Sequence, residues 1–321
     1  MVSQSALRRS KQVFLCEGPA RSSNQVDQVS LPVSLDFSTV IQVLMQGILI
    51  GGLYGLVAIG MNVIFGVMGI INISHGDFIV LAAFVSFWLY SIFGINPLIS
   101  LFPVAILMFL ISVPVFQVLM KRATKISVDT ALIVAFGISL ILQNLMTQFW
   151  TGDTRLITLR FPDVAVQGFT LPARFLVGFV ISLISSLSLY AVIKKTFIGK
   201  AIIAVSLDSR AAALVGIDTD RIRQLSFGIG LLMAGVAGAL LSFVYPFVPT
   251  SGASYTFVAF VIVVLGGVGN PVGSMVGGLI LGMVGSMSSL FGPGWSTFAS
   301  FMLFIIVLLV KPEGLFQRFG A

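Results

Sequence analysis

Residues 52–77 read GLYGLVAIGMNVIFGVMGIINISHGD and lie in the middle of a much longer apolar run. Asp77 is the only formally charged residue in the range 37–120. The run at 38–93 holds about 55 residues, which at 1.5 Å per residue suits two crossings of a ~30 Å hydrocarbon core. Glycine and polar residues at 69–76 are typical of a bend between the crossings. This stretch therefore predicts two consecutive transmembrane helices.

The composition of the whole chain supports the same conclusion. Its 321 residues are 57% hydrophobic and only 9% charged, whereas a soluble domain has about 25% charged residues. The net charge of +7 can indicate nucleic-acid binding, but the basic residues form short clusters between apolar runs. We therefore expect membrane lipid, and no nucleic acid, as the surroundings. A single cysteine, Cys16, excludes a disulfide framework and a cysteine metal site.

Nine segments approach the length of a membrane span. They lie at 38–68, 75–93, 98–120, 128–149, 174–193, 224–244, 256–268, 272–290 and 296–310. The prediction is an all-α, polytopic transmembrane bundle of about eight or nine spans, forming one membrane domain at 37–321. Residues 1–36 are polar and have no apolar core long enough for a signal peptide. We expect them to be a disordered tail, or upstream sequence that precedes the mature protein.

The basic clusters predict the topology. They lie at 121–125, at 194–223 and at 311–318, and the positive-inside rule makes all three cytoplasmic. The C-terminus is then cytoplasmic, and the loop at 150–174 is on the outer side. The side on which the N-terminal tail lies stays open, because span parity and its basic residues disagree.

A run of helix breakers at 266–273 reads GGVGNPVG within an uncharged hydrophobic stretch. It predicts a discontinuous helix. Broken backbone at membrane depth often marks a solute path, which makes Gly266, Gly267, Gly269 and Asn270 candidates. The alternative is a tight cytoplasmic turn between two short spans.

Small residues recur at a spacing of four, which places them on one helix face and allows close packing or dimerisation. They form three sets: Gly47, Gly51 and Gly55; Gly230, Ala234, Gly238 and Ser242; Gly269, Gly273 and Gly277.

The segment at 199–223 lies on the basic side between two spans and is the most informative polar segment. We predict a short helix there, capped by Ser206 or Asp208 and ended by a left-handed residue at Gly216. So short a helix is marginal alone, so it docks onto a partner or onto its own bundle. The residues concerned are Asp208, Ser209, Arg210, Ala211, Ala212, Ala213, Leu214, Val215 and Gly216.

No catalytic constellation is present in the sequence. His75 is the only histidine, and Gly199-Lys200 is followed by Ala201 where a phosphate loop needs Ser or Thr. We expect no metal, no bound cofactor and no ATP hydrolysis by this chain.

Four motifs resemble signatures of the branched-chain amino acid ABC transporter permease family. They are residues 52–77, residues 208–217, VLGGVGNPVGS at 264–274 and KPEGLF at 311–316. They occur in the family's order and cover the chain from about residue 38 onwards. The resemblance implies a second homologous permease, two cytoplasmic ABC ATPases that hydrolyse ATP, a periplasmic solute-binding protein and location in the cell inner membrane. It also implies that 208–216 is the coupling loop that docks in an ATPase groove.

Polar residues inside the spans are the remaining candidates for the solute path. His75 and Asp77, near the predicted bend on the cytoplasmic side, can form a proton relay. Alternatively, Asn72 or Ser74 caps the second helix, and the dipole of that helix stabilises the negative charge of Asp77 near its start. This is our preferred interpretation. Further along the spans, Asn62, Gln143 and Asn144 can line a path or form interhelical hydrogen bonds.

The function we infer is the permease subunit of an importer for a branched-chain amino acid or a similar small solute, working by alternating access. Urea or short amides are alternative solutes. An ion-coupled secondary carrier or channel is the alternative class, and an intramembrane enzyme is disfavoured because paired acidic residues are missing from the spans.

Overall fold

The computed structural model describes residues 37–159, 162–166, 169–292, 294–311 and 314–316. The chain divides into two units, Met1–Leu35 and Asp36–Ala321. The first unit, and with it the expected disordered tail at 1–36, lies outside the described residues. Everything below concerns the second unit.

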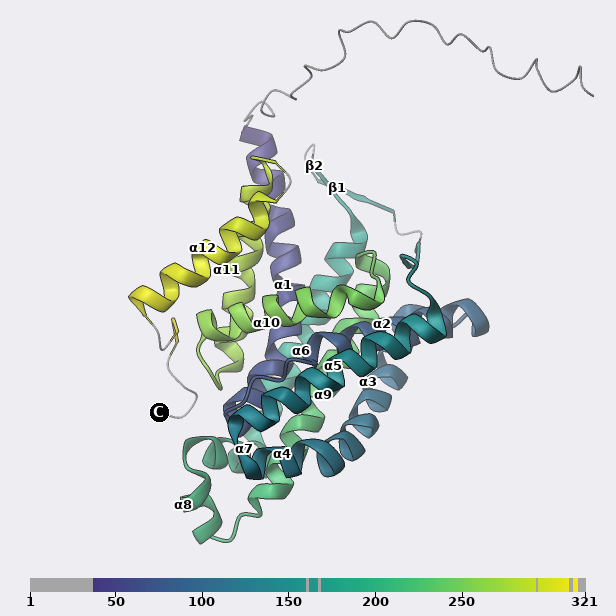
Figure 1. The fold of residues 1–321 in the computed structure, drawn as a ribbon. Helices are drawn as coiled ribbons and strands as arrows, with labels where there is room; N and C mark the ends of the chain where they lie inside the picture. The colour runs from purple at the N-terminus through teal and green to yellow at the C-terminus, as the bar shows by residue number, and fades with distance from the viewer. Residues whose placement is uncertain (1–36, 160–161, 167–168, 293, 312–313, 317–321) are drawn as a thin grey trace, which may run out of the picture. The chain divides into compact units, whose positions relative to one another are not determined.

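The described chain is almost entirely helical, as predicted, with one short antiparallel hairpin (Figure 1). The helices are α1 (Phe37–Met68), α2 (His75–Phe93), α3 (Pro97–Pro114), a π-helical turn (Val115–Met120), α4 (Lys121–Ile126), α5 (Val128–Trp150), α6 (Ala173–Lys195), α7 (Phe197–Leu207), α8 (Ser209–Leu214), α9 (Thr219–Val244), a 3-10 turn (Pro249–Ser251), α10 (Gly252–Gly266), α11 (Pro271–Ser289) and α12 (Trp295–Val310). The hairpin pairs β1 (Val164–Val166) with β2 (Phe169–Leu171).

Eight helical segments among the described residues are long and apolar enough to cross a membrane. This agrees with the predicted eight to nine spans. The ninth expected span, at 296–310, corresponds to α12. Its 16 residues reach about 24 Å at 1.5 Å per residue, short of a ~30 Å hydrocarbon core.

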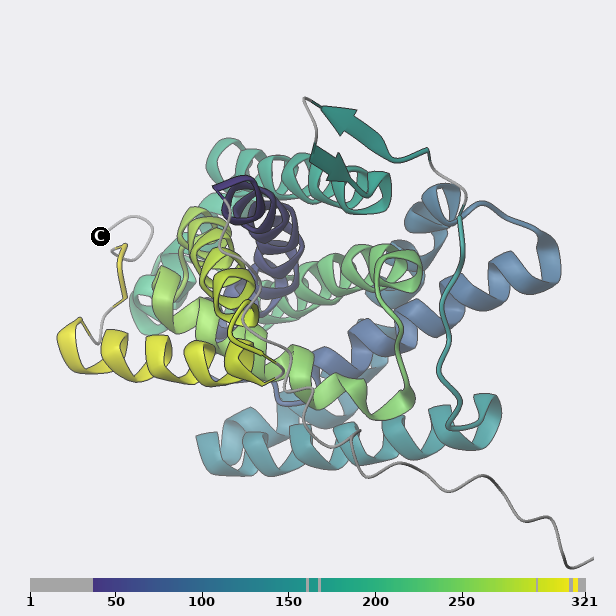
Figure 2. The ribbon, with the colours of Figure 1, turned by 90° about the horizontal axis from the view of Figure 1, so that it is seen from above.

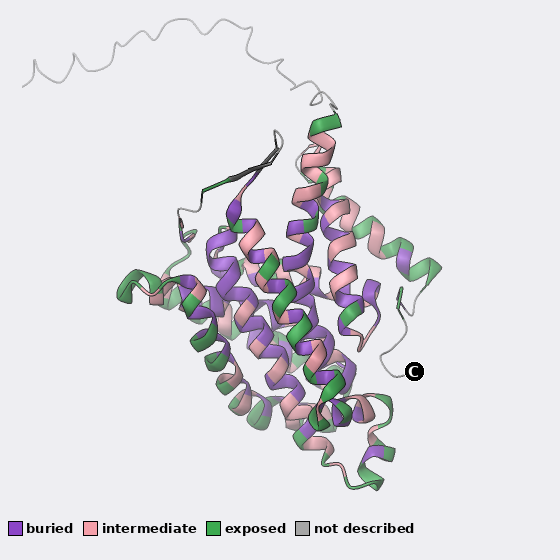
Figure 3. Ribbon diagram, turned by 180° about the vertical axis from the view of Figure 1, so that it is seen from behind, coloured by how far each residue is buried: buried purple, intermediate pink, exposed green. Residues whose placement is uncertain are grey.

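Two helices, α1 and α9, form the centre of the bundle. In the most apolar 18-residue stretch of each helix, 78% of the residues of α1 and 83% of those of α9 are buried, against 28% in α5 and in α6. Figure 2 shows α1 nearly end-on with α6, α9 and α11 around it, and Figure 3 shows the buried surface concentrated on these inner helices. The outer faces of α3, α5 and α12 carry exposed apolar side chains, as a lipid-facing surface does.

The Gly47, Gly51 and Gly55 stripe of α1 packs directly against α11. A Cβ atom on Gly51 would come within 2.7 Å of the Leu279 Cα atom, and Gly282 approaches α1 from the other side of the same contact. The missing side chains allow the two backbones to meet. This stripe is therefore an intrachain helix contact, and it is not available for dimerisation.

Two of the predicted cytoplasmic basic clusters lie at the same end of the bundle. Lys121 and Lys125 of α4 form ion pairs with Asp220 at the start of α9, at 3.1 and 3.5 Å. Partly exposed pairs of this kind contribute roughly 0–1 kcal/mol. The pairs place the basic cluster at 121–125 beside the basic cluster at 194–223, as the positive-inside rule requires if both are cytoplasmic.

Candidate solute site and coupling segment

The first break in the bundle is the α1–α2 turn, at residues 69–74. α1 ends at Met68, and Gly69 has a φ of 67°, which favours glycine. The Nε2 atom of His75 then lies 3.1 Å from the carbonyl oxygen of Val57, to which it donates. At 1.5 Å per residue, Val57 is about 16 Å before the end of α1. The sequence predicted that α2 starts near one end of the bundle, but α2 begins deep within it.

The N-terminus of α2 is not capped by the residues that precede it. We expected Asn72 or Ser74 to accept first-turn amides, and this was wrong, since Ser74 Oγ donates to Asn72 Oδ1 at 2.7 Å instead. The Gly76 amide donates to Thr256 Oγ1 at 2.9 Å, and the Thr256 hydroxyl donates to the Ile73 carbonyl at 3.0 Å. A side chain of α10 therefore caps α2.

His75 and Asp77 are fully buried but contact different helices. His75 bonds to α1, whereas the Asp77 Oδ1 atom accepts from Gln143 Nε2 of α5 at 3.0 Å. Gly252, the first residue of α10, packs against the Asp77 carboxylate. Residues two positions apart on a helix point roughly 200° apart. The arrangement therefore does not form the His75–Asp77 relay that motivated the ion-coupled alternative.

The second break is the α10–α11 turn, at residues 267–270, within the predicted run of helix breakers. α10 ends at Gly266 and α11 begins at Pro271. Gly267 and Gly269 have φ values of 95° and 78°, which favour glycine. Asn270 caps α11 by accepting from two amides of its first turn, both at 3.1 Å. Gly269 thus precedes α11 and is not on its small-residue face, contrary to the predicted stripe.

Asn62 of α1 fills this turn. Its amide nitrogen donates to the carbonyl oxygens of Gly267 (3.1 Å) and Asn270 (2.9 Å) and to Ser274 Oγ, while its oxygen accepts from the Gly269 amide. The side chain is fully buried. Broken backbone at membrane depth needs polar partners, and here another helix supplies them. This geometry favours the tight-turn interpretation of 266–273 over a water-filled path.

The other predicted path residues do not gather around one opening. Asn72 and Ser74 are buried in the α1–α2 turn. Asn144 is exposed on α5, where it donates to the carbonyl of its own helix at 2.7 Å. Within the described residues, Asn72 Nδ2, His75 Nδ1 and Asp77 Oδ2 are buried without a hydrogen-bond partner.

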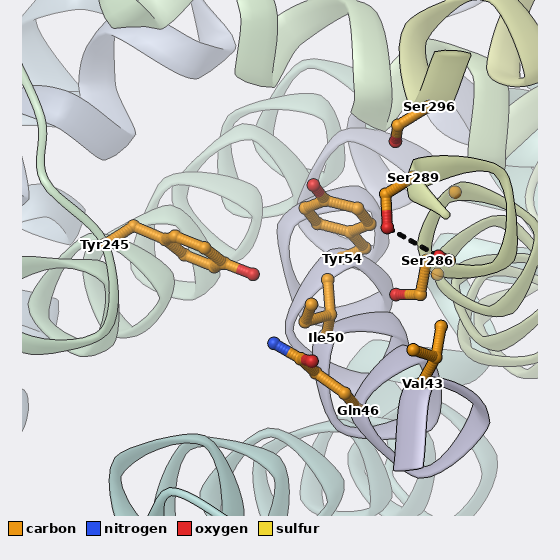
Figure 4. A pocket seen from close by; sticks show the side chains of 10 residues that line it. Val43, Gln46, Ile50, Tyr54, Tyr245, Ser286, Ser289 and Ser296 are labelled. Atoms are coloured by element: carbon orange, nitrogen blue, oxygen red, sulfur yellow. Dashed lines mark hydrogen bonds between the residues drawn. The ribbon is translucent and has the colours of Figure 1, made fainter. Parts of the chain in front are cut away.

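A polar cavity opens elsewhere, between the N-terminal half of α1, the C-terminal end of α11 and the start of α12. Its volume is about 210 Å³. Figure 4 shows the Tyr245 hydroxyl directed towards α1, with Tyr54 and three serines across from it. The lining residues are Val43, Gln46, Ile50, Tyr54, Tyr245, Gly282, Gly285, Ser286, Ser289 and Ser296, none of them charged.

The polar groups of this cavity are largely unpaired. Ser289 donates to the Ser286 carbonyl at 2.6 Å, the contact drawn in Figure 4. Unpaired side chains, judged within the part of the chain that the structure describes, are those of Gln46, Tyr54, Tyr245, Ser286 and Ser296. These side chains are partly exposed and line a cavity, so the cluster of polar groups without protein partners indicates a place for water or a polar solute.

A second, larger cavity of about 410 Å³ adjoins the first and shares Tyr54, Gly285 and Ser296 with it. Its wall is mainly apolar, and the rings of Phe257 and Phe301 pack at a centroid distance of 4.4 Å there. The remaining lining residues are Ala253, Ser254, Val258, Leu281, Thr297 and Ser300. Small-molecule sites commonly enclose about 300–1,000 Å³, so this space is large enough for a small solute.

The segment at 208–216 forms the predicted capped helix, α8. The Asp208 carboxylate accepts from the amides of Arg210 (2.8 Å) and Ala211 (3.0 Å), and these bonds hold the pKa of Asp208 below its ordinary value. Gly216 ends the helix with a φ of 87°. Ser206 takes no part in the cap, because its hydroxyl donates to the Ile203 carbonyl.

One side of α8 is anchored and its tip is free. Ala212 is only 4% exposed and belongs to a cluster with Val67 of α1 and Ile202 of α7. Leu214 and Val215 are 89% and 78% exposed. Leu214 and Val215 are therefore the large apolar residues of this segment that are available to a partner. Ala212, which the sequence grouped with them, is part of the anchor.

Sequence reasoning missed the two cavities. Their polar residues are neutral serines, tyrosines and a glutamine scattered over 46–300, with no shared motif. One sequence feature could have indicated a polar cavity, namely the many hydroxyl side chains at 286–300, SMSSLFGPGWSTFAS, between two spans. It indicates a particular site only when the fold brings Gln46 and Tyr54 of α1, and Tyr245 after α9, to the same place.

Comparison with known proteins gives a consistent set of relatives. Residues 43–309 match the protein family described as "Branched-chain amino acid transport system / permease component". The chain is 31% identical to the high-affinity branched-chain amino acid transport system permease protein LivH of Salmonella typhimurium, and 32% identical to LivH of Escherichia coli. Each match covers 89% of this chain and 98% of the relative. The corresponding protein BraD of Pseudomonas aeruginosa is 28% identical over 87% of this chain and 96% of the relative.

Proposed function

Because the chain belongs to the family of permease components of branched-chain amino acid transport systems, we propose that it is the permease subunit of an ATP-driven importer. The proposed solute is a branched-chain amino acid, and the location is the cell inner membrane. The chain is a multi-pass membrane protein with eight candidate spans among its described residues. In this proposal α7, α8 and the C-terminus lie in the cytoplasm. The observation that carries it is the family match over residues 43–309.

The proposal includes a set of partners. They are a second, homologous permease, two cytoplasmic ABC ATPases that hydrolyse ATP, and a periplasmic solute-binding protein, while this chain itself binds no cofactor. The exposed Leu214 and Val215 support the ATPase contact, because an anchored helix with a free apolar tip suits a helix-in-groove interaction.

Helix α1 is suited to connect the coupling segment with the solute site. Its C-terminal end carries Val67, which packs in the α7–α8 cluster. Asn62 ties the same helix to the α10–α11 turn, and Tyr54 lines both cavities. Packed helices move as rigid bodies between discrete arrangements. A displacement of α8 by the ATPases can therefore reach the cavities through one helix.

The central test is a double variant, Leu214→Asp with Val215→Asp, in the complete transporter reconstituted in proteoliposomes. Charged groups at the tip should remove the apolar contact, so we expect ATPase co-purification to fall and ATP-dependent leucine uptake to drop more than about tenfold, or 1.4 kcal/mol. The matched control is Ile126→Asp, which alters an exposed apolar residue at the same end of the bundle.

Two results contradict the proposal. One is normal uptake and normal ATPase co-purification in the double variant. The other is leucine transport by this chain alone, without ATPases. Parallel uptake assays with urea and acetamide decide between an amino acid and the alternative solutes.

A further inference from the structure

We propose that the two adjoining cavities form one binding site for a zwitterionic amino acid with an apolar side chain. The smaller cavity holds the ammonium and carboxylate groups, and the larger holds the side chain. This inference rests on the proposed import function and assigns its solute site.

The smaller cavity has the chemistry for a zwitterion. The hydroxyls of Tyr54, Tyr245, Ser286 and Ser296 can donate to a carboxylate, and their oxygens, with that of Gln46, can accept from an ammonium group. Hydrogen bonds to ionised groups are stronger than those between neutral groups. Among the residues that the structure describes, no charged side chain lines either cavity. A solute with a net charge would therefore be buried without a counter-charge, which is strongly unfavourable, whereas a zwitterion carries its own.

The larger cavity has the chemistry for an aliphatic side chain. Phe257, Val258, Leu281 and Phe301 line it, and its wall is mainly apolar. An apolar group therefore gains free energy by leaving water there. Because the two cavities share lining residues, one solute can place its two unlike halves in them at the same time.

The junction between the cavities depends on a glycine. Gly285 lines both, and a Cβ atom there would be 3.0 Å from Ser296 Oγ, with no other atom of the described residues outside its own helix within 4 Å. A large side chain at this position would fill the junction without meeting a backbone. Gly285 is thus the point at which the site can be closed with the least damage to the fold.

The test measures leucine uptake by the complete transporter, with its binding protein, in proteoliposomes. Gly285→Leu should lower uptake more than tenfold while the permease still assembles with its ATPases. Gly137→Leu is the matched control, because Gly137 lies within α5 with nothing within 4 Å of an added Cβ atom, and it should transport normally. Tyr54→Phe removes one hydroxyl alone and should lower the maximal uptake rate several-fold with an unchanged melting temperature.

A second readout is independent of transport rate. In a Cys16→Ser background, Ser286→Cys should react with a small water-soluble thiol reagent. Leucine with its binding protein should slow that reaction more than fivefold, and succinate, a dianion, should not.

The outcomes separate the two claims. Normal uptake in Gly285→Leu, or labelling of Ser286→Cys that leucine does not slow, overturns the site and leaves the import function standing. A wild-type complex that imports no amino acid overturns the proposed function and this inference with it.

Discussion

Two polar regions lie about two turns apart on α1, and they differ in one respect. Around Asn62, the side chain makes four hydrogen bonds and is fully buried. Around Tyr54, polar side chains face a cavity, and among the described residues most have no partner. Both regions are neutral and both lie within apolar helices. A polar residue within an apolar helix therefore does not identify a solute site by itself; unpaired polar side chains that line a cavity do.

The largest expected effect on stability is at the region around Asn62, called the closed region because its polar groups are paired. Asn62→Leu introduces an apolar side chain of similar size, leaves the Gly269 amide without its partner and removes one of the hydrogen bonds to the Gly267 and Asn270 carbonyls, which keep a backbone donor each. At about 1–3 kcal/mol for a buried unsatisfied group, we expect a loss of about 3 kcal/mol, seen as a lower melting temperature of the purified protein. Asn144→Leu, on the exposed face of α5, is the control and should change little. An unchanged melting temperature in Asn62→Leu would falsify the closed-turn interpretation.

In the α1–α2 turn, two backbone groups are likewise paired by a side chain of another helix. Thr256→Val removes the hydroxyl that accepts from the Gly76 amide and donates to the Ile73 carbonyl. We expect about 2 kcal/mol of destabilisation from the two unpaired backbone groups, measured by thermal unfolding. Thr256→Ser, which keeps the hydroxyl, should restore most of it. Equal stability of the valine and serine variants would show that α10 does not cap α2.

In the region around Tyr54, called the open region because its polar side chains face a cavity, a substitution should lower transport and leave stability unchanged. Gln46→Ala breaks no hydrogen bond with described residues, so we expect the stability to change by less than about 0.5 kcal/mol. Leucine uptake should fall about tenfold, equivalent to 1.4 kcal/mol. A variant that loses stability instead of transport would place Gln46 with the closed region and remove the contrast between the two.

The smallest effect is expected at α8, outside the membrane. Asp208→Ala removes the bonds to the Arg210 and Ala211 amides and should raise their hydrogen-exchange rates without lowering the global melting temperature. The pKa of Asp208 is lowered by these bonds. The cap is therefore fully present above the ordinary aspartate value and is lost as the pH falls through the lowered value. Asp208→Asn should keep the helix capped and abolish this acid dependence; exchange that accelerates equally with acid in Asp208→Asn would contradict the assignment.

Local chemistry made several elements predictable. The positions of the helix breaks at 69–74 and 267–270 follow from glycine and polar residues inside apolar runs. The Asp208 cap and the left-handed Gly216 follow from local hydrogen bonding and from backbone freedom. Each of these depends on neighbours within a few positions of the chain, which is why a pattern reveals them.

Other features depend on contacts across the chain and were not predicted. Thr256 caps a helix that starts some 180 positions earlier, and Asn62 satisfies a turn more than 200 positions later. The predicted cap by Asn72 or Ser74 failed because a distant hydroxyl took that role. Ala212 was grouped with Leu214 because α8 is too short to show which side is anchored until α1 and α7 are in place.

The sequence alone determined that this is a helical membrane protein, where its spans break and which permease family it resembles, because the absence of charge, the glycine positions and the short motifs are local properties. Only the tertiary structure decided which polar residues are satisfied and which face a cavity, because that depends on the partners that packing brings to each group. The candidate solute site belongs to this second category. Its residues come from α1, α10, α11 and α12 and, with Tyr245, from the position directly after α9, and only folding brings them together.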